Sequence, residues 1–130
     1  MRWYVDSSAI IKLIKVELES RALVDALPKT ILSSTLARVE VIRSVTFHFS
    51  ELLEEAHAVL AEIEMLPIDN AVIALAENLP PFMSLRTLDS IHIASALTVK
   101  SSIEGLITYD KEMIKAAEAL GFRVLSPGMK

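Results

Sequence analysis

Short apolar, β-prone runs alternate along this chain with longer segments of helical patterning, and this alternation most constrains the fold. The expected strands are Arg2 to Val5, Thr30 to Ser33, Met65 to Ile68, Gly105 to Thr108 and Phe122 to Leu125. Alternation of strands with helices is typical of a mainly parallel sheet that helices cover on both faces. The sequence therefore predicts an α/β fold.

Capping and stop signals place the helices between these runs. Only three glycines occur, all in the last quarter of the chain, which favours a mostly helical domain with short strands. Pro28 ends one helical segment, and Pro80-Pro81 must be loop. The predicted helices run from Ala9 to Ile14, Glu19 to Leu27, Leu36 to Phe49, Glu51 to Ile63, Asp69 to Asn78, Thr87 to Val99 and Lys111 to Leu120.

Length and composition narrow the class of protein. The 130 residues suit a single domain, 1–130, and the 52% hydrophobic content allows a proper core with apolar surface left for a partner or a second copy. The absence of cysteine excludes disulfides and thiolate metal sites. No apolar stretch is long enough for a membrane span, so we expect a cytoplasmic protein. A net charge of −4 argues against a general nucleic-acid binder, but an enzyme can meet phosphate through bound cations.

Four acidic residues lie at positions that make them candidates for an active site. Asp6 and Asp110 each follow a predicted strand and precede a helix, and the carboxyl ends of parallel strands are where sites form. Asp89 lies early in its helix, and Glu40 lies on a helix that is apolar on almost every side, where a carboxylate needs a partner.

Each acid also has a simpler interpretation. Asp6 and Asp110 suit helix caps, Asp89 suits the positive end of a helix dipole, and Glu40 could pair with Arg43 on its own helix. From the residues alone the chain is an α/β domain with a possible acidic site.

Four segments together carry a resemblance. Tyr4 to Ala9, Ser34 to Glu40, Leu85 to Ala96 and Leu106 to Asp110 resemble, in this order and spacing, the motifs of PIN domains. They are similar in particular to the VapC-type toxins of bacterial and archaeal toxin–antitoxin pairs, and the resemblance extends from Met1 to about Pro127.

The resemblance implies a Rossmann-like, three-layer sandwich with a central sheet of four to five strands, and an endoribonuclease that depends on Mg²⁺ or Mn²⁺. It also implies a cognate antitoxin and a toxin homodimer, and we expect part of the partner surface on the helices from Leu36 to Ile63. The residues onto which it carries catalytic and metal-binding roles are Asp6, Glu40, Asp89 and Asp110, with Thr108, Ser7 and Glu112 as supporting groups.

Phosphodiester cleavage explains why such a site would need cations. Four clustered carboxylates repel a polyanion and cannot all stay ionised without positive charge, and hard cations prefer oxygen ligands. A bound ion lowers the pKa of the attacking water and stabilises the leaving oxygen. Arg86, Arg43 and Lys12 are available for RNA phosphates. His92 could be a metal ligand, but we expect it to pack or to bond a neighbouring carboxylate.

Three other interpretations compete with an RNA nuclease. A receiver-like signalling module is disfavoured because serines follow Asp6 where that class has a second acid. A degenerate PIN domain that only binds partners is disfavoured because all four acids are present. A structure-specific DNA nuclease is disfavoured by the small size of the chain.

Overall fold

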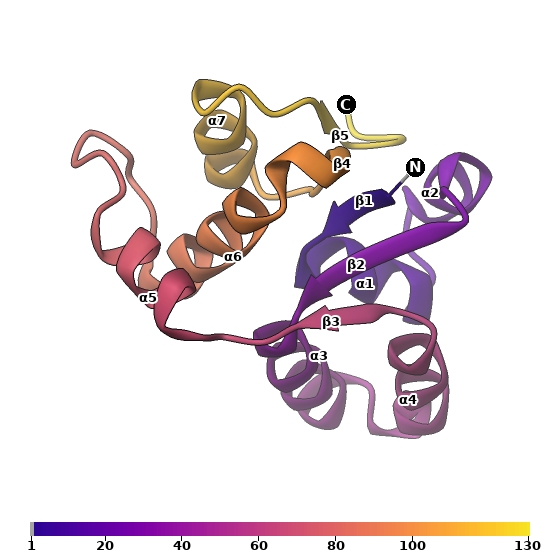
Figure 1. The fold of residues 1–130 in the computed structure, drawn as a ribbon. Helices are drawn as coiled ribbons and strands as arrows, with labels where there is room; N and C mark the ends of the chain where they lie inside the picture. Colours follow the sequence, from indigo (N-terminus) through magenta and orange to yellow (C-terminus); the bar gives the residue numbers. More distant parts are fainter. Residues whose placement is uncertain (1) are drawn as a thin grey trace.

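The computed structural model describes residues 2–130 and has a five-stranded parallel sheet at its centre (Figure 1). The strand order is β3-β2-β1-β4-β5. All four neighbouring pairs are parallel, which confirms the predicted α/β class. The strands are β1 (Arg2–Val5), β2 (Thr30–Ser34), β3 (Glu64–Leu66), β4 (Ile103–Ile107) and β5 (Val124–Leu125).

Helices cover both faces of this sheet, with α6 and α7 on one side and α1, α3 and α4 on the other (Figure 1). Successive residues of β1 point to opposite faces, so Trp3 and Val5 enter one apolar cluster and Tyr4 enters the other. The helices are α1 (Ser7–Ile14), α2 (Ser20–Ala26), α3 (Thr35–His48), α4 (Leu53–Ala61), α5 (Asn70–Glu77), α6 (Thr87–Thr98) and α7 (Lys111–Ala119), with 3-10 turns at Ser50–Leu52 and Lys100–Ser102.

The third helix differs from its prediction. Its apolar residues on almost every side indicated a buried helix, but only Ala37, Val41 and Val45, spaced four residues apart, are fully buried. Val39 is 56% exposed and Phe47 is 77% exposed, so the prediction of a buried helix is wrong. The pattern of apolar residues could not distinguish the face of this helix that packs on the core from the apolar residues that remain on the surface.

The strand order places the expected site. From β1 the chain builds β2 and β3 on one side, and then returns to place β4 and β5 on the other. The carboxyl ends of β1 and β4 therefore flank the point where the order reverses, which is where open α/β sheets form their binding crevice. Asp6 follows β1 and Asp110 follows β4, so the topology brings these two segments together.

No helix within residues 2–130 is long and apolar enough to cross a membrane.

Gly105 generates a test of the packing between β4 and its neighbours. A Cβ atom at this position would collide with the carbonyl oxygen of Arg123 and lie 2.8 Å from the Trp3 ring. We expect Gly105→Ala to lower the free energy of unfolding by about 1–3 kcal/mol, as overpacking does. Thermal unfolding should show a melting temperature lower by roughly 4 °C for each kcal/mol.

The control is Ser101→Ala in the exposed turn before β4, which should leave the melting temperature unchanged. An unchanged melting temperature for Gly105→Ala would contradict the close approach of these strands.

Candidate active site

Asp6 is the most enclosed acid of the site, with 4% of its surface exposed. It caps α1, where Oδ1 accepts a hydrogen bond from the amide of Ala9 at 3.2 Å. The hydroxyl of Ser8 donates to the same oxygen at 2.6 Å, and the hydroxyl of Thr108 donates to Oδ2 at 2.5 Å. Burial nevertheless raises the pKa of Asp6, because desolvation outweighs these hydrogen bonds.

Thr108 links Asp6 to the acid at the end of the neighbouring strand. Its Oγ1 also accepts a hydrogen bond from the backbone amide of Asp110 at 3.2 Å. Asp110 caps α7, where its Oδ1 accepts from the amides of Glu112 at 2.8 Å and Met113 at 3.1 Å. The capping interpretation is thus confirmed for both aspartates, and Thr108 links the two caps.

Arg86 lies near both Asp89 and Asp110. Its guanidinium is 3.6 Å from Oδ2 of Asp89 and 3.9 Å from Oδ2 of Asp110. Burial and the nearby charge of Asp110 raise the pKa of Asp89, while Arg86 partly offsets them. Because the Arg86 side chain is 85% exposed, these ion pairs add little stability and leave the guanidinium accessible to a ligand.

Glu40 reaches the site from α3 and pairs with a buried histidine of α6. Nε2 of His92 lies 2.6 Å from Oε1 of Glu40, and Nδ1 lies 2.7 Å from the hydroxyl of Tyr4. Of the two roles expected for His92, packing or bonding a neighbouring carboxylate, the structure shows the bond to a carboxylate. The alternative pairing of Glu40 with Arg43 is wrong, since α6 supplies the closer partner.

A cavity of about 430 Å³ opens beside these groups. It lies between α3 and the first turn of α6, within the size range of ligand-binding clefts. Its lining residues are Glu40, Arg86, Thr87, Leu88 and Asp89. Two of the four acids therefore line this opening, and Arg86 joins it to the third, Asp110.

The donor set can be compared with the needs of a divalent cation. Over residues 2–130, no three acid or histidine groups lie close enough to form a ready-made metal cluster. Mg²⁺ does not require one, because it keeps several waters and binds through one or two carboxylates. The carboxylate of Asp6 is almost fully buried, and the charge of Asp110 makes ionisation of Asp89 more costly. A divalent cation would offset both costs, so these residues fit a site for such an ion.

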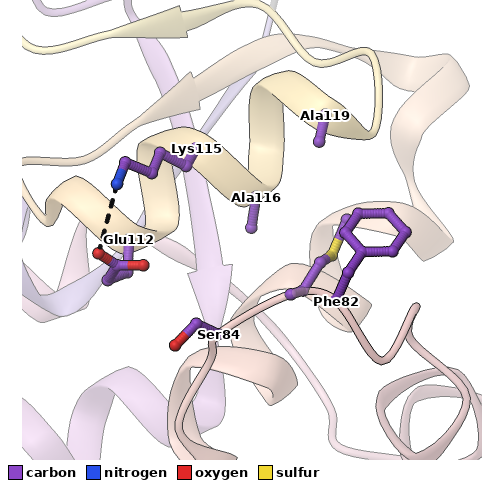
Figure 2. Close-up of a pocket in the computed structure, with 7 residues that line it drawn as sticks. Phe82, Ser84, Glu112, Lys115, Ala116 and Ala119 are labelled. Carbon is purple, nitrogen blue, oxygen red and sulfur yellow. Dashed lines mark ion pairs between the residues drawn. The ribbon is translucent and has the colours of Figure 1, made fainter.

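The supporting residues fall in different places. Ser8, which the sequence did not single out, bonds Asp6, and its neighbour Ser7 lies partly buried in the first turn of α1. Glu112 is 3.8 Å from Lys115, at one end of a second hollow of about 330 Å³ that Phe82 and Ala119 help to line (Figure 2).

The three side chains predicted to bind RNA phosphates lie in different surroundings. Lys12 is engaged by Glu17 at 3.4 Å and Glu19 at 2.9 Å and lies over the Tyr109 ring, so its charge is already used. Arg43 is exposed and lines a shallow hollow of α3 and α4 with Arg38 and His57, apart from the residues of the 430 Å³ cavity. Of the three predicted RNA-binding cations, Arg86 alone lies among the acids.

Comparison with known proteins identifies relatives of the whole chain. The family model described as "PIN domain" matches residues 3–119. The chain is 39% identical to Ribonuclease VapC35 and 41% identical to Ribonuclease VapC46, both of Mycobacterium tuberculosis, over 95–96% of this chain and 96% of each relative.

Solved structures agree in fold. A toxin–antitoxin complex from Klebsiella pneumoniae superposes with a TM-score of 0.78 at 18% identity, covering 98% of this chain and 99% of that one. Mycobacterium tuberculosis VapC20, a toxin that cleaves the sarcin–ricin loop, superposes with a TM-score of 0.73 at 15% identity, covering 98% of this chain and all of that one.

The buried charge of Asp6 makes a prediction about stability. A carboxyl whose pKa is raised on folding stabilises the fold only below its unfolded pKa of about 4, and this contribution is lost as pH rises. In metal-free buffer at pH 7, Asp6→Asn should therefore raise the melting temperature, by about 4 °C for each kcal/mol relieved.

The difference between the two proteins should shrink as the pH falls toward 4, which thermal scans across pH can follow. A melting temperature for Asp6→Asn that is lower at pH 7 would mean that the hydrogen bonds of Asp6 outweigh its desolvation.

Proposed function

This chain belongs to the PIN-domain family and, within it, to the VapC ribonucleases, and we propose that it is the endoribonuclease toxin of a type II toxin–antitoxin pair. The observation that carries the proposal is the link from buried Asp6 through Thr108 to Asp110, beside a cavity lined by Glu40 and Asp89. Such a group of acids is costly for stability and suits a site that handles phosphate through cations.

We propose that Asp6, Asp89, Asp110 and Glu40 hold Mg²⁺ or Mn²⁺. The bound ion supplies positive charge for the phosphoryl oxygens and lowers the pKa of a water. Ser8 and Thr108 fix the orientation of Asp6, since their hydroxyls occupy both carboxylate oxygens. Glu40 accepts a hydrogen bond from the attacking water and serves as its base. Ser7 and Glu112 remain supporting candidates around this set.

Arg86 is the group of this chain that meets the RNA phosphate. It is largely exposed, and its ion pairs with Asp89 and Asp110 are long and therefore weak. A phosphate can replace these two contacts. A guanidinium also presents a planar set of donors that matches two phosphate oxygens. From its position in the cavity lining, Arg86 would hold the substrate backbone over the carboxylates.

Partners follow from the same family. Solved relatives by fold include toxin–antitoxin complexes, and we propose that a VapB-type antitoxin covers the acidic site and that two toxins pair. Exposed Val39 and Phe47 on α3 provide apolar surface for one of these contacts. We also propose a cytoplasmic location, where both an RNA substrate and an antitoxin would be met.

Asp6→Asn tests the proposed activity. It keeps the side-chain shape and removes the charge, so we expect cleavage of total RNA in Mg²⁺ to fall to background. The matched control is Asp69→Asn, which alters the cap of α5 without touching the acids and should keep full activity. RNA integrity on denaturing gels gives the measurement, with EDTA as a second control that should abolish cleavage.

Product ends give a further readout of the same reaction. Attack by water predicts a 5′-phosphate and a 3′-hydroxyl. A 2′,3′-cyclic phosphate, or full cleavage by Asp6→Asn, would contradict the proposed chemistry.

Arg86→Ala tests the phosphate contact. In an Asp6→Asn background, which holds RNA uncleaved, we expect weaker binding and a salt dependence whose log–log slope falls by about 0.7 for one lost contact to a single strand. Arg21→Ala is the control, because Arg21 is also largely exposed and pairs with Asp25 on α2. Equal slopes for the Arg86 and Arg21 variants would remove Arg86 from the substrate contact.

A further inference from the structure

His92 is buried and has both ring nitrogens engaged. Only 1% of its surface is exposed, and its neighbours are Tyr4 from β1 and Glu40 from α3. The other two histidines, His48 and His57, are exposed on α3 and α4. A buried imidazole with two short contacts has a fixed ring orientation, so the atom it presents to Glu40 is also fixed.

Tyr4 determines which nitrogen carries the proton. A phenol has its proton at neutral pH, so the Tyr4 hydroxyl can donate a hydrogen bond to Nδ1, which lies 2.7 Å away. Nδ1 then acts as the acceptor, so the ring proton lies on Nε2. Nε2 donates to Oε1 of Glu40 at 2.6 Å.

Glu40 is thereby held by one oxygen only. Among residues 2–130, Oε1 has the contact with His92, while no side chain or amide donates a hydrogen bond to Oε2. Glu40 lines the 430 Å³ cavity, so its uncommitted oxygen remains available to a water or cation there. A glutamate side chain without this contact would sample several rotamers.

We propose that His92, oriented by Tyr4, is a positioning residue that holds the Glu40 carboxylate for the reaction. The inference rests on the proposed function, since it assigns a role within that same site. Hydrogen-bond partners of metal-binding or catalytic groups commonly act in this way by fixing the orientation of the group they contact. His92 touches neither substrate nor cation in this arrangement and acts through Glu40.

Three substitutions separate positioning from packing. Tyr4→Phe removes the hydroxyl but keeps the ring that packs edge-on against His92, with centroids 5.9 Å apart. His92→Phe keeps a ring and removes the donor. His92→Gln restores a donor near the place of Nε2. His57→Gln is the matched control at an exposed histidine.

Steady-state cleavage of a short RNA is measured for each variant, with thermal unfolding alongside. We expect His92→Phe to lower kcat by about 10–100-fold with KM nearly unchanged. His92→Gln should recover most of this loss, Tyr4→Phe should lose several-fold in kcat, and His57→Gln should match the wild type. In a Glu40→Gln background, His92→Phe should cause little further loss, because it acts through Glu40.

Two results would overturn the inference: equal kcat for His92→Phe and wild type, or equal losses for the His92→Phe and His92→Gln variants. If His92→Phe fails to fold, an unchanged kcat for Tyr4→Phe overturns it alone. If the wild type cleaves no RNA, the proposed function fails. The positioning arrangement is then judged from the ring ¹⁵N signals of His92, which should report a proton on Nε2 in the wild type and a shifted proton distribution in Tyr4→Phe.

Discussion

The carboxylate of Asp6 lies at the end of the central strand, almost out of contact with water, and the rest of the site is arranged around the cost of its charge. Three hydrogen bonds from Ser8, Ala9 and Thr108 stabilise the ionised form, yet burial still raises its pKa. A buried anion in this condition either takes up a proton or gains a counter-charge. We propose that a divalent cation provides that charge. The buried carboxylate of Asp6, which destabilises the fold, would then be the group that binds the ion.

Topology turns this local constraint into a site. Strand β1 lies between β2 and β4, and the order of strands reverses between β1 and β4, so residues about a hundred positions apart meet at one rim. Thr108 joins the two strand ends, and the helix that follows each strand begins with an aspartate cap. Helices α3 and α6 then add Glu40 and Asp89 from the two faces of the sheet. The same residues can thus start helices and bind ligands, which is why capping and function are not alternatives here.

The two strand-end acids could be predicted from the sequence, because an aspartate between a β-prone run and a helix has a definite place in a parallel sheet. The pairing of Glu40 with His92 was harder to predict, since it joins α3 to α6 across the sheet edge and depends on how the helices rotate and pack. Tyr4 was invisible as a functional residue because its strand position indicates core, which it also is. Ser8 was missed in favour of Ser7, since only the turn of the helix decides which hydroxyl faces Asp6. The exposure of Val39 and Phe47 was not predictable for a related reason, as apolar composition does not reveal which face is left for a partner.

Diffraction from crystals of the protein soaked in Mn²⁺, collected to give the anomalous signal of manganese, tests the central claim most directly. We predict an anomalous peak within about 2–2.5 Å of the Asp6 carboxylate, with oxygen atoms of Asp89, Asp110 or Glu40, or waters bound to them, completing its coordination. A crystal that holds manganese elsewhere on the surface and none beside Asp6 would contradict the claim, since the buried charge would then be balanced by a proton.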